Sequence, residues 1–494
     1  MEKEEIKKWM KEPLNFVLIL VLVFAIGIRL YYFTLTLGQP LWWDEAAYGS
    51  VARNFANGGV WSQTDLIIGE KSIRPPLFSI LWGVLVKIGF GESGVRFLLN
   101  FLPSVMAVFF VYLIGKEIYG KKTAIISTFI FSVLWIHLFY TGRLLTHIPD
   151  MGFLFPSIYF FILSMKKEFN GKYFSISMVL GALSTLIRYP NGLIFFVYLG
   201  FLIITLRTDL LKNKKFWLSG IFGITPLWIF FINNYFKFGN IFPAFLGSDY
   251  VKAVNEKFGF YVLNFIPAYL TPIFFGAFLI GILTILFELI LGFDQVAKNE
   301  KIKGNLLILL LFFVIYSFFI FYIRGAEDRW LFPASVSLVL FSGYGLNKIY
   351  EFIGKYQKNF AVILILVLLL FGAYKEITFA DEIIKNRRQT YLQIRQGFEW
   401  IKDNTPENSK ILGAGIEAYS LYYAERGYIS FAANEEDTDV LAENADYLVL
   451  HVFSSHPEFV NSYVQERQDI WKPAMAFFMD EAKTQPGFVI YQKA

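Results

Sequence analysis

The chain has 494 residues, of which 56% are hydrophobic and 17% are charged, and its formal net charge at pH 7 is +5. Soluble domains carry about 25% charged residues, so this composition excludes an ordinary soluble enzyme and indicates a polytopic membrane protein with some soluble material attached. The sequence contains no cysteine, which excludes disulfides, thiolate metal sites and cysteine nucleophiles. We expect membrane lipid and no nucleic acid among its partners.

The first apolar run follows a mixed-charge N-terminus, MEKEEIKKWMKEP, and lacks a small-residue cleavage site, so we interpret it as an uncleaved span. A helix needs about 20 apolar residues to cross about 30 Å of hydrocarbon. Eleven segments approach this length and are predicted to cross: residues 14–33, 97–119, 124–140, 151–165, 174–187, 192–206, 216–235, 266–291, 306–323, 331–346 and 360–374.

A twelfth apolar segment, residues 77–90, would reach only about 21 Å at 1.5 Å per residue, and it contains Lys87. If this segment does not cross, the lysine clusters of every second loop fall on the side of the N-terminus, as expected for cytoplasmic loops. We therefore predict a cytoplasmic N-terminus and a long outer loop with interfacial helices over residues 34–94.

Hydropathy drops from residue 381 onward, and eleven spans place this part outside the cytoplasm. QIRQGFEWIKDN reads as an amphipathic helix, SKILGAGI, ADYLVLHVF and GFVIYQK read as strands, and EAYSLYYAERG reads as helical. Strands alternating with helices indicate a small α/β domain. The prediction is a mostly α-helical transmembrane domain over residues 1–380 and an extracytoplasmic α/β domain over residues 381–494.

Arginines and acids, rather than lysines, populate the expected outer face, several of them at the ends of spans. Ionisable groups at membrane depth are costly and often mark a site, and a guanidinium suits bidentate phosphate binding. A carboxylate there could act as general base toward a hydroxyl, and an arginine could stabilise a departing phosphate. The residues are Asp44, Glu45, Arg53, Arg74, Arg96, Arg143, His147, Asp150, Arg188, Arg324, Glu327, Asp328 and Arg329.

Four motifs resemble those of the membrane-embedded GT-C glycosyltransferases, in the branch of the protein O-mannosyltransferases and the bacterial aminoarabinose transferase (glycosyltransferase families 39 and 83). WWDEAAYG is similar to that family's Asp-Glu motif, and IRPPLFSILW to its basic-Pro-Pro-Leu element. ESGVRFLLNFLPS, leading into GKEIYGKK, and EDRWLFPASVSLVLFSGYGL resemble two later elements. Together the four motifs extend over most of residues 1–350, and their order and spacing carry the resemblance.

The resemblance implies a polyprenyl- or dolichyl-phosphate sugar as donor, and a hydroxyl of a lipid, glycan or protein as acceptor. It implies inversion with Asp44 as general base, supported by Glu45, with Asp150 as a second acid. Arg74 stands where the family places a cation on the donor phosphate. Further phosphate-binding candidates are Arg96, Arg143 and Arg329, while His147 is a candidate for substrate or metal contact.

The sequence also departs from the family. Ala46 and Ala47 follow the acid pair where the aminoarabinose enzymes carry an arginine, and Ile73 stands where those enzymes carry an acid tied to a metal. A lipid A acceptor and a divalent metal therefore have no support from these positions.

Structural interpretations compete with the functional ones. Asp44 and Glu45 could cap a helix, Arg74 could anchor at the interface, and Arg96 could be structural. Arg143 could pair with Asp150, and Glu327 with Asp328 could form a solvated loop. A secondary transporter or lipid flippase is the alternative function, although such proteins often show internal repeats that this sequence lacks.

Overall fold

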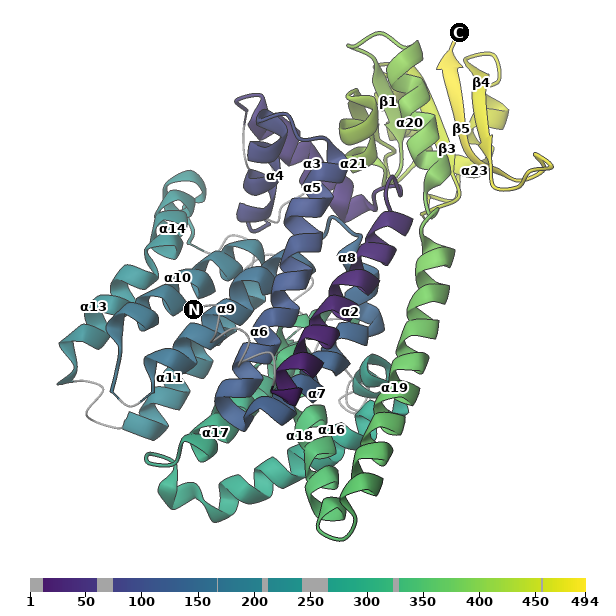
Figure 1. Ribbon diagram of the computed structural model, residues 1–494. Helices are drawn as coiled ribbons and strands as arrows, with labels where there is room; N and C mark the ends of the chain where they lie inside the picture. The colour runs from purple at the N-terminus through teal and green to yellow at the C-terminus, as the bar shows by residue number, and fades with distance from the viewer. Residues whose placement is uncertain are drawn as a thin grey trace. The chain divides into compact units, whose positions relative to one another are not determined.

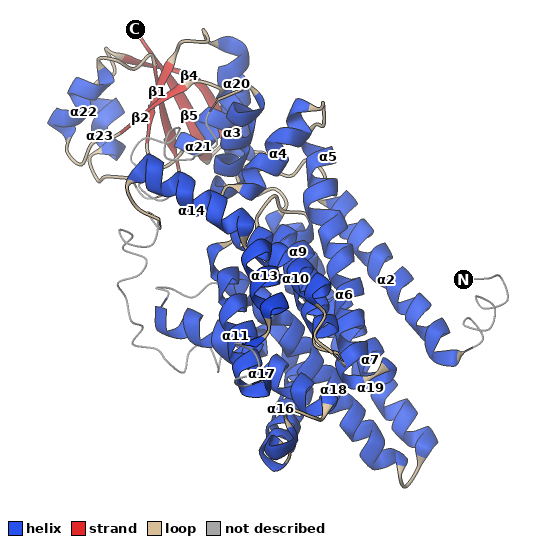
Figure 2. Ribbon diagram, turned by 90° about the vertical axis from the view of Figure 1, so that its left-hand side faces the viewer, coloured by secondary structure: helices blue, strands red, loops and turns tan. Residues whose placement is uncertain are grey.

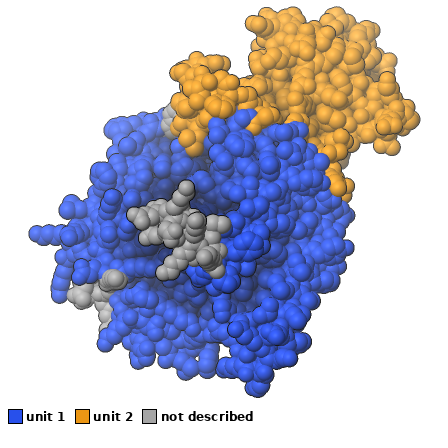
Figure 3. Space-filling model, in the orientation of Figure 1, with its two compact units in different colours: residues 1–37, 71–78, 94–384 blue, residues 38–70, 79–93, 385–494 orange. Residues whose placement is uncertain are grey.

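The computed structural model describes residues 12–59, 74–166, 168–206, 212–241, 265–322, 328–454 and 456–494. The chain is mostly helical with one small sheet, and its contacts divide it into two compact units, which Figure 3 distinguishes by colour. Unit 1 comprises residues 1–37, 71–78 and 94–384, and unit 2 comprises residues 38–70, 79–93 and 385–494.

Unit 1 is a helical bundle in which every predicted span falls on a helix or a bent pair of helices. Its first helices, α2, α6 and α7, contact one another and run side by side (Figure 1). The helices are α2 (Pro13–Leu35), α6 (Leu102–Tyr119), α7 (Lys121–Val133), α8 (Trp135–Thr141), α9 (His147–Ser164), α10 (Gly171–Ile187), α11 (Leu193–Leu206), α13 (Lys214–Gly223), α14 (Thr225–Phe238), α16 (Ile266–Leu291), α17 (Glu300–Tyr322), α18 (Ser335–Gly354) and α19 (Lys358–Arg387).

Among the described residues, five helices are long and apolar enough to cross a membrane, and up to seven spans result if each bent pair counts as one. The two pairs are α7 with α8, bent by 56°, and α13 with α14, bent by 52°. The chain is thus a multi-pass membrane protein, and the count of eleven stays a prediction. The segment predicted not to cross forms α4 (Leu77–Lys87), whose 11 residues reach only about 16 Å.

Small residues let the helices of unit 1 approach closely. A Cβ at Gly281 of α16 would collide with the carbonyl oxygen of Phe341 in α18, and one at Gly345 of α18 would collide with the carbonyl oxygen of Ala277. Gly343 faces Ser127 of α7 in the same way. Membrane helices commonly pack through such small residues, because burial against lipid-like side chains supplies little driving force.

Unit 2 contains a five-stranded mixed sheet with the order β2-β1-β3-β5-β4, drawn red in Figure 2. The strands β1, β2 and β3 are parallel, whereas β5 is antiparallel to both β3 and β4. The three predicted strands correspond to β1, β3 and β5, whereas β2 and β4 were not predicted. The bounds are β1 (Lys410–Gly413), β2 (Gly427–Ser430), β3 (Tyr447–His451), β4 (Trp471–Phe478) and β5 (Pro486–Lys493).

Helices cover both faces of this sheet (Figure 2). The predicted amphipathic helix is α20 (Leu392–Asn404), and its Phe398 ring lies 5.2 Å from that of Phe488 in β5. The other face carries α22 (Glu435–Ala442) and α23 (Val460–Glu466), around a buried cluster that includes Leu412, Leu448 and Trp471. These two layers give the C-terminal part a core of its own.

Unit 2 also contains much of the first outer loop. The helix α3 (Trp43–Ala56) and most of α4 cluster by contacts with residues 385–494. The sequence-based division at residue 380, with the loop assigned to the transmembrane domain, stays a prediction. The clustering adds that this loop and the C-terminal part share one packed interior.

Candidate active site

The acid pair lies in the first turn of α3, and the structure separates its two members. The carboxylate of Glu45 is fully buried, and its Oε2 accepts a hydrogen bond of 2.6 Å from the backbone N–H of Trp42, which precedes the helix. Asp44 is half-buried. Glu45 therefore serves as the helix cap that was considered for both acids, and Asp44 is the less buried member of the pair.

The two alanines that follow the pair lie against the interior of unit 2. Ala46 and Ala47 are both fully buried, and so is Ala52 two turns later. An arginine at either of the first two positions would bury a charge, which is costly without a partner. The departure from the aminoarabinose motif is therefore a matter of packing on this helix.

The second predicted acid, Asp150, lies in the first turn of α9 and is fully buried. Its Oδ2 pairs with Nη1 of Arg188 at 3.5 Å, and its backbone oxygen accepts a hydrogen bond of 3.3 Å from Ser184. Its other carboxylate oxygen, Oδ1, has no hydrogen-bond partner among the described residues. The ion pair of Asp150 is thus with Arg188, a residue in the outer-face group that was not singled out.

His147 begins α9 and brings further predicted residues together. Its ring lies 5.6 Å from that of Phe332, in the 3-10 helix Asp328–Ala334 that also contains Arg329. Four polar residues therefore share one neighbourhood in unit 1: His147, Asp150, Arg188 and Arg329. Two of its members are cations, so this neighbourhood can accept an anion.

Arg96 and Arg143 are almost wholly buried, each with 1% of its surface exposed. Arg96 ends helix α5 (Glu92–Arg96), and its Nη1 donates to the carbonyl oxygen of Gly142. Asn100, one turn later, donates to the carbonyl oxygens of Arg143 and Leu145. These side chains brace the loop between α8 and α9, which agrees with the structural alternative for Arg96.

Sequence reasoning missed Arg29, a fully buried arginine in the middle of α2. Its Nε donates to the hydroxyl of Ser104 at 2.9 Å, and its Nη1 donates to the carbonyl oxygen of Ser132 at 2.9 Å. The latter carbonyl lies next to the bend between α7 and α8, where carbonyls lose their helical partners. A lone arginine inside the first apolar run was the signal.

A second buried acid was also missed. Glu376 of α19 is fully buried, and its Oε2 accepts a hydrogen bond of 3.1 Å from the backbone N–H of Trp135, the first residue of α8. The helix α7 ends at Val133, so this carboxylate satisfies a donor that the break in the span exposes. We regard Glu376 as part of the fold of the bent span.

Arg74 is half-buried and belongs to unit 1, whereas Asp44 and Glu45 belong to unit 2. Arg324 and Glu327 lie outside the described residues. No group of three or more His, Asp or Glu side chains suited to a metal ion occurs in the described part of the chain. The described residues therefore do not supply a ligand set for a resident metal.

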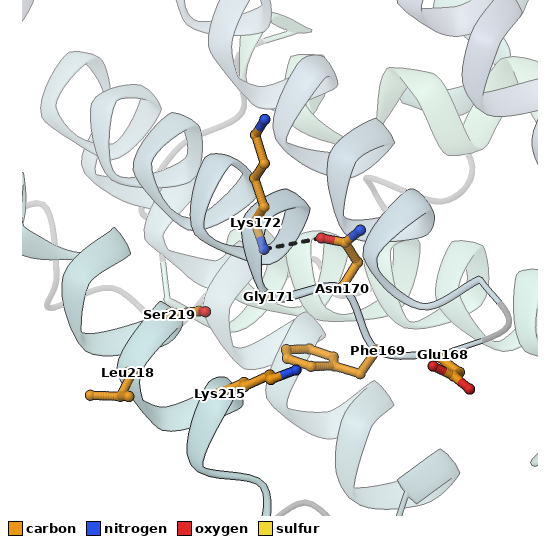
Figure 4. Close-up of a pocket in the computed structure, with 8 residues that line it drawn as sticks. All are labelled: Glu168, Phe169, Asn170, Gly171, Lys172, Lys215, Leu218 and Ser219. Atoms are coloured by element: carbon orange, nitrogen blue, oxygen red, sulfur yellow. Dashed lines mark hydrogen bonds between the residues drawn. The ribbon is translucent and has the colours of Figure 1, made fainter.

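One open pocket of about 540 Å³ lies at the starts of α10 and α13 (Figure 4). Lys172 and Lys215 line it together with Asn170, whose side chain caps α10. None of the predicted site residues lines this pocket, so the candidate site rests on the two polar groups described above.

The family model described as dolichyl-phosphate-mannose-protein mannosyltransferase matches residues 73–231. This range contains Arg74, Arg96, Arg143, His147 and Asp150. An uncharacterized protein of Aquifex aeolicus (strain VF5) is 26% identical over 266 residues, which are 51% of this chain and 50% of the relative. The match therefore spans about half of each protein.

Solved structures of GT-C enzymes share the fold. The apo oligosaccharyltransferase of Archaeoglobus fulgidus aligns with a TM-score of 0.69 at 15% identity, over 98% of this chain and 75% of that one. ArnT of Cupriavidus metallidurans bound to undecaprenyl phosphate aligns with a TM-score of 0.63 at 11% identity, over 95% and 97%. Arabinofuranosyltransferase AftD from Mycobacteria aligns with a TM-score of 0.59 at 13% identity, over 97% and 40%.

The chain has the GT-C fold of these solved transferases, and the mannosyltransferase family model matches part of it, residues 73–231. The resemblance inferred from four short motifs is thereby confirmed, as are a mostly helical membrane part and a small C-terminal sheet. The number of spans, the orientation in the membrane and the roles of individual residues stay predictions.

Proposed function

We propose that this glycosyltransferase moves one sugar from a polyprenyl-phosphate donor to a hydroxyl of an extracytoplasmic lipid, glycan or protein, with inversion and with Asp44 as general base. The observation that carries the proposal is the separation of the acid pair on α3. Glu45 is buried and bonded to the backbone of Trp42, whereas Asp44, beside it in the same first turn, is only half-buried.

The chemistry needs one base and a stabilised leaving group. The acceptor hydroxyl gives its proton to the Asp44 carboxylate, and its oxygen attacks the anomeric carbon from the face opposite the phosphate. The bond between that carbon and the phosphate oxygen breaks, and polyprenyl phosphate leaves with both electrons. Arginines neutralise the charge that develops on this phosphate. No nucleotide sugar takes part.

Names of similar proteins support the donor class. The Archaeoglobus fulgidus enzyme has been solved with an inhibitory peptide and a dolichol-phosphate, and ArnT with undecaprenyl phosphate. The family model adds mannose as the first sugar to try. For the phosphate, Arg74 and Arg329 are half-buried, whereas Arg96 and Arg143 are almost wholly buried and Arg96 braces a loop. We therefore assign the phosphate contact to Arg74 and Arg329 first, and add Arg188 beside His147.

The remaining predicted residues take supporting roles in this proposal. Asp150 is paired with Arg188 inside unit 1, so it orients that guanidinium rather than receiving the acceptor proton. Arg96, with Asn100, holds the loop that contains Arg143 and leads into α9. The active site and unit 2 face the non-cytoplasmic side, in agreement with the loop charges of the sequence.

The test uses the full chain in liposomes with a radiolabelled polyprenyl-phosphate mannose and a panel of hydroxyl acceptors. Loss of a general base lowers rates by about 10²- to 10⁴-fold, so Asp44→Asn should reduce transfer by that factor. Asp294→Asn is the matched control, because Asp294 is an exposed carboxylate in the short 3-10 helix Phe293–Gln295 that follows α16. Transfer by Asp44→Asn at the wild-type rate would remove Asp44 as base.

The alternative function is a secondary transporter or lipid flippase. The family model and the shared fold favour the transferase. Movement of an intact labelled polyprenyl-phosphate sugar across the liposome, with no labelled acceptor formed under any condition, would favour the alternative.

A further inference from the structure

The sequence does not indicate a role for the C-terminal domain. The contacts of this domain with α3 suggest a role in positioning that helix. The segment EAYSLYYAERG forms a short helix, α21 (Glu417–Tyr419), and a π-helical turn, Ser420–Ala424. Both pack against α3, the helix that carries Asp44. We name residues 417–425 of this segment the tyrosine clasp, after the three tyrosines Tyr419, Tyr422 and Tyr423.

Hydrogen bonds join the clasp to both sides of the acid pair. Before the pair, the hydroxyl of Tyr423 accepts a bond of 2.8 Å from the backbone N–H of Leu41. After the pair, the hydroxyl of Ser50 donates chiefly to the carbonyl oxygen of Ala46 at 2.8 Å, and it also lies 3.3 Å from the carbonyl oxygen of Ala418. The clasp thus contacts the chain from Leu41, just before α3, to Ser50 in the second turn of that helix.

Arg53, near the end of α3, makes the third attachment. Its guanidinium lies 4.0 Å from the ring centroid of Tyr422, donates to the carbonyl oxygen of the same residue, and forms an ion pair of 3.1 Å with Glu425. This pair is partly exposed, so its charge adds little. The stacking and the bond to a backbone carbonyl fix the rotation of α3 about its axis.

Shape complementarity completes the contact. A Cβ at Gly49 would lie 2.5 Å from the ring of Tyr422 and 2.9 Å from the ring of Trp82, so only glycine permits this approach. The hydroxyl of Tyr422 reaches on to Glu92, at 3.1 Å. Tyr422 therefore lies between α3 and the segment that follows α4, and it contacts both.

We propose that the tyrosine clasp is a positioning element, through which the C-terminal domain holds the helix that presents Asp44 to the acceptor hydroxyl. This inference rests on the proposed function, because it assigns the clasp to the same base. The clasp residues act through α3, so they are positioning residues. A catalytic geometry tolerates only small displacements of its groups, and a clasp that spans both ends of the acid pair meets that demand.

The first arm of the test measures position without activity. In the full chain in nanodiscs, hydrogen exchange of the α3 amides should rise at least tenfold in Gly49→Ala and in Arg53→Gln. Arg467→Gln is the matched control, since Arg467 pairs with Asp439 at 2.8 Å in the same domain, next to α23. That change should raise exchange in α22 and α23 and leave α3 as in the wild type.

The second arm measures transfer from radiolabelled polyprenyl-phosphate mannose. Gly49→Ala should lower kcat at least tenfold with an unchanged KM for the donor, and the double variant Gly49→Ala with Tyr422→Ala should recover part of kcat, because it removes the ring that the new methyl group meets. Arg467→Gln should keep the wild-type kcat.

The two arms separate the inference from the function on which it rests. If α3 exchange stays at the wild-type level in both clasp variants, or rises while kcat is unchanged, the positioning role is overturned. If Asp44→Asn transfers sugar normally, the base assignment fails, whatever the exchange shows. Loosened α3, lower kcat and recovery in the double variant together support the clasp.

Discussion

The helices α3 and α9 each carry a candidate acid in the first turn, and their surroundings give Asp44 and Asp150 different chemistry. In α3 the half-buried Asp44 lies in the same first turn that Glu45 caps. In α9 Asp150 is fully buried and paired with Arg188. The sequence pattern is alike, an acid near a helix start at a span mouth. The comparison teaches that access to solvent, and not residue type, distinguishes a candidate base from an internal ion pair.

The largest effect expected from this comparison concerns Asp44. Asp44→Asn should lower sugar transfer by about 10²- to 10⁴-fold and leave the thermal unfolding midpoint of the detergent-solubilised protein unchanged. The reason is that asparagine has nearly the same shape as aspartate, so the packing of this half-buried side chain is kept while its ability to take a proton is lost. A large fall in the midpoint would place Asp44 in the same structural class as Asp150.

The reverse outcome is expected at the ion pair of α9. Arg188→Gln leaves a fully buried carboxylate without its cation, and breaking such a pair costs about 3–5 kcal/mol. The thermal midpoint should fall markedly, and adding Asp150→Asn should restore part of it by removing the unpaired charge. An Arg188→Gln protein with the wild-type midpoint would contradict the internal role of the pair.

Burial also controls the protonation of a histidine in unit 2, His451. Burial lowers the pKa of His451 from 6.5 to about 4, and its neutral ring is held at both nitrogens. Its Nε2 lies 2.8 Å from the carbonyl oxygen of Ala414, and its Nδ1 accepts a hydrogen bond from the backbone N–H of Phe453. Folding therefore favours the neutral ring.

Below pH 6.5 the unfolded chain binds a proton that the folded domain does not. The contribution of His451 is thus complete above pH 6.5 and is lost as the pH falls toward 4, by about 1.4 kcal/mol per pH unit. Protection of the β3 amides, corrected for intrinsic exchange, should decrease over this window. The decrease should be smaller in His451→Gln, and an identical pH dependence in both proteins would refute the assignment.

The smallest effect is expected at the other acid of α3. Glu45→Gln keeps a side-chain acceptor for the backbone N–H of Trp42 but removes the charge near the helix start, so stability should fall by about 1 kcal/mol. Transfer should fall far less than in Asp44→Asn. A loss of transfer equal to that of Asp44→Asn would return Glu45 to the catalytic group.

Much of the fold was predictable because hydropathy and alternation are local properties. Each of the eleven apolar runs coincides with helix, and β1, β3 and β5 were found from their apolar residues. The strands β2 and β4 were not predicted. The strand β2 has only four residues, and β4 contains Pro473, so both give little local signal. The helix α19 continues to Arg387, past the end of its apolar run, because a fall in hydropathy marks a membrane boundary and not the end of a helix.

The candidate site was predictable only as a set of residue types. Spacing in the sequence named Asp44, Arg74 and Asp150, but it could not choose Arg188 over Arg143 as the partner of Asp150. It could not foresee Arg29 beside the bend of α7 and α8. Partner choice depends on which side chains meet after the chain has packed, and motif spacing carries no such information.

By itself, the sequence determined that this protein lies in a membrane, that it has the GT-C fold and which charged residues stand near its expected outer face. Apolar run length and short motifs carry that information, since both act within a few turns of helix. Only the tertiary structure decided that Glu45 caps α3 while Asp44 stays accessible, and that the tyrosine clasp holds this helix. The clasp depends on contacts between segments more than 300 residues apart, such as Leu41 with Tyr423, which form only when the chain is folded.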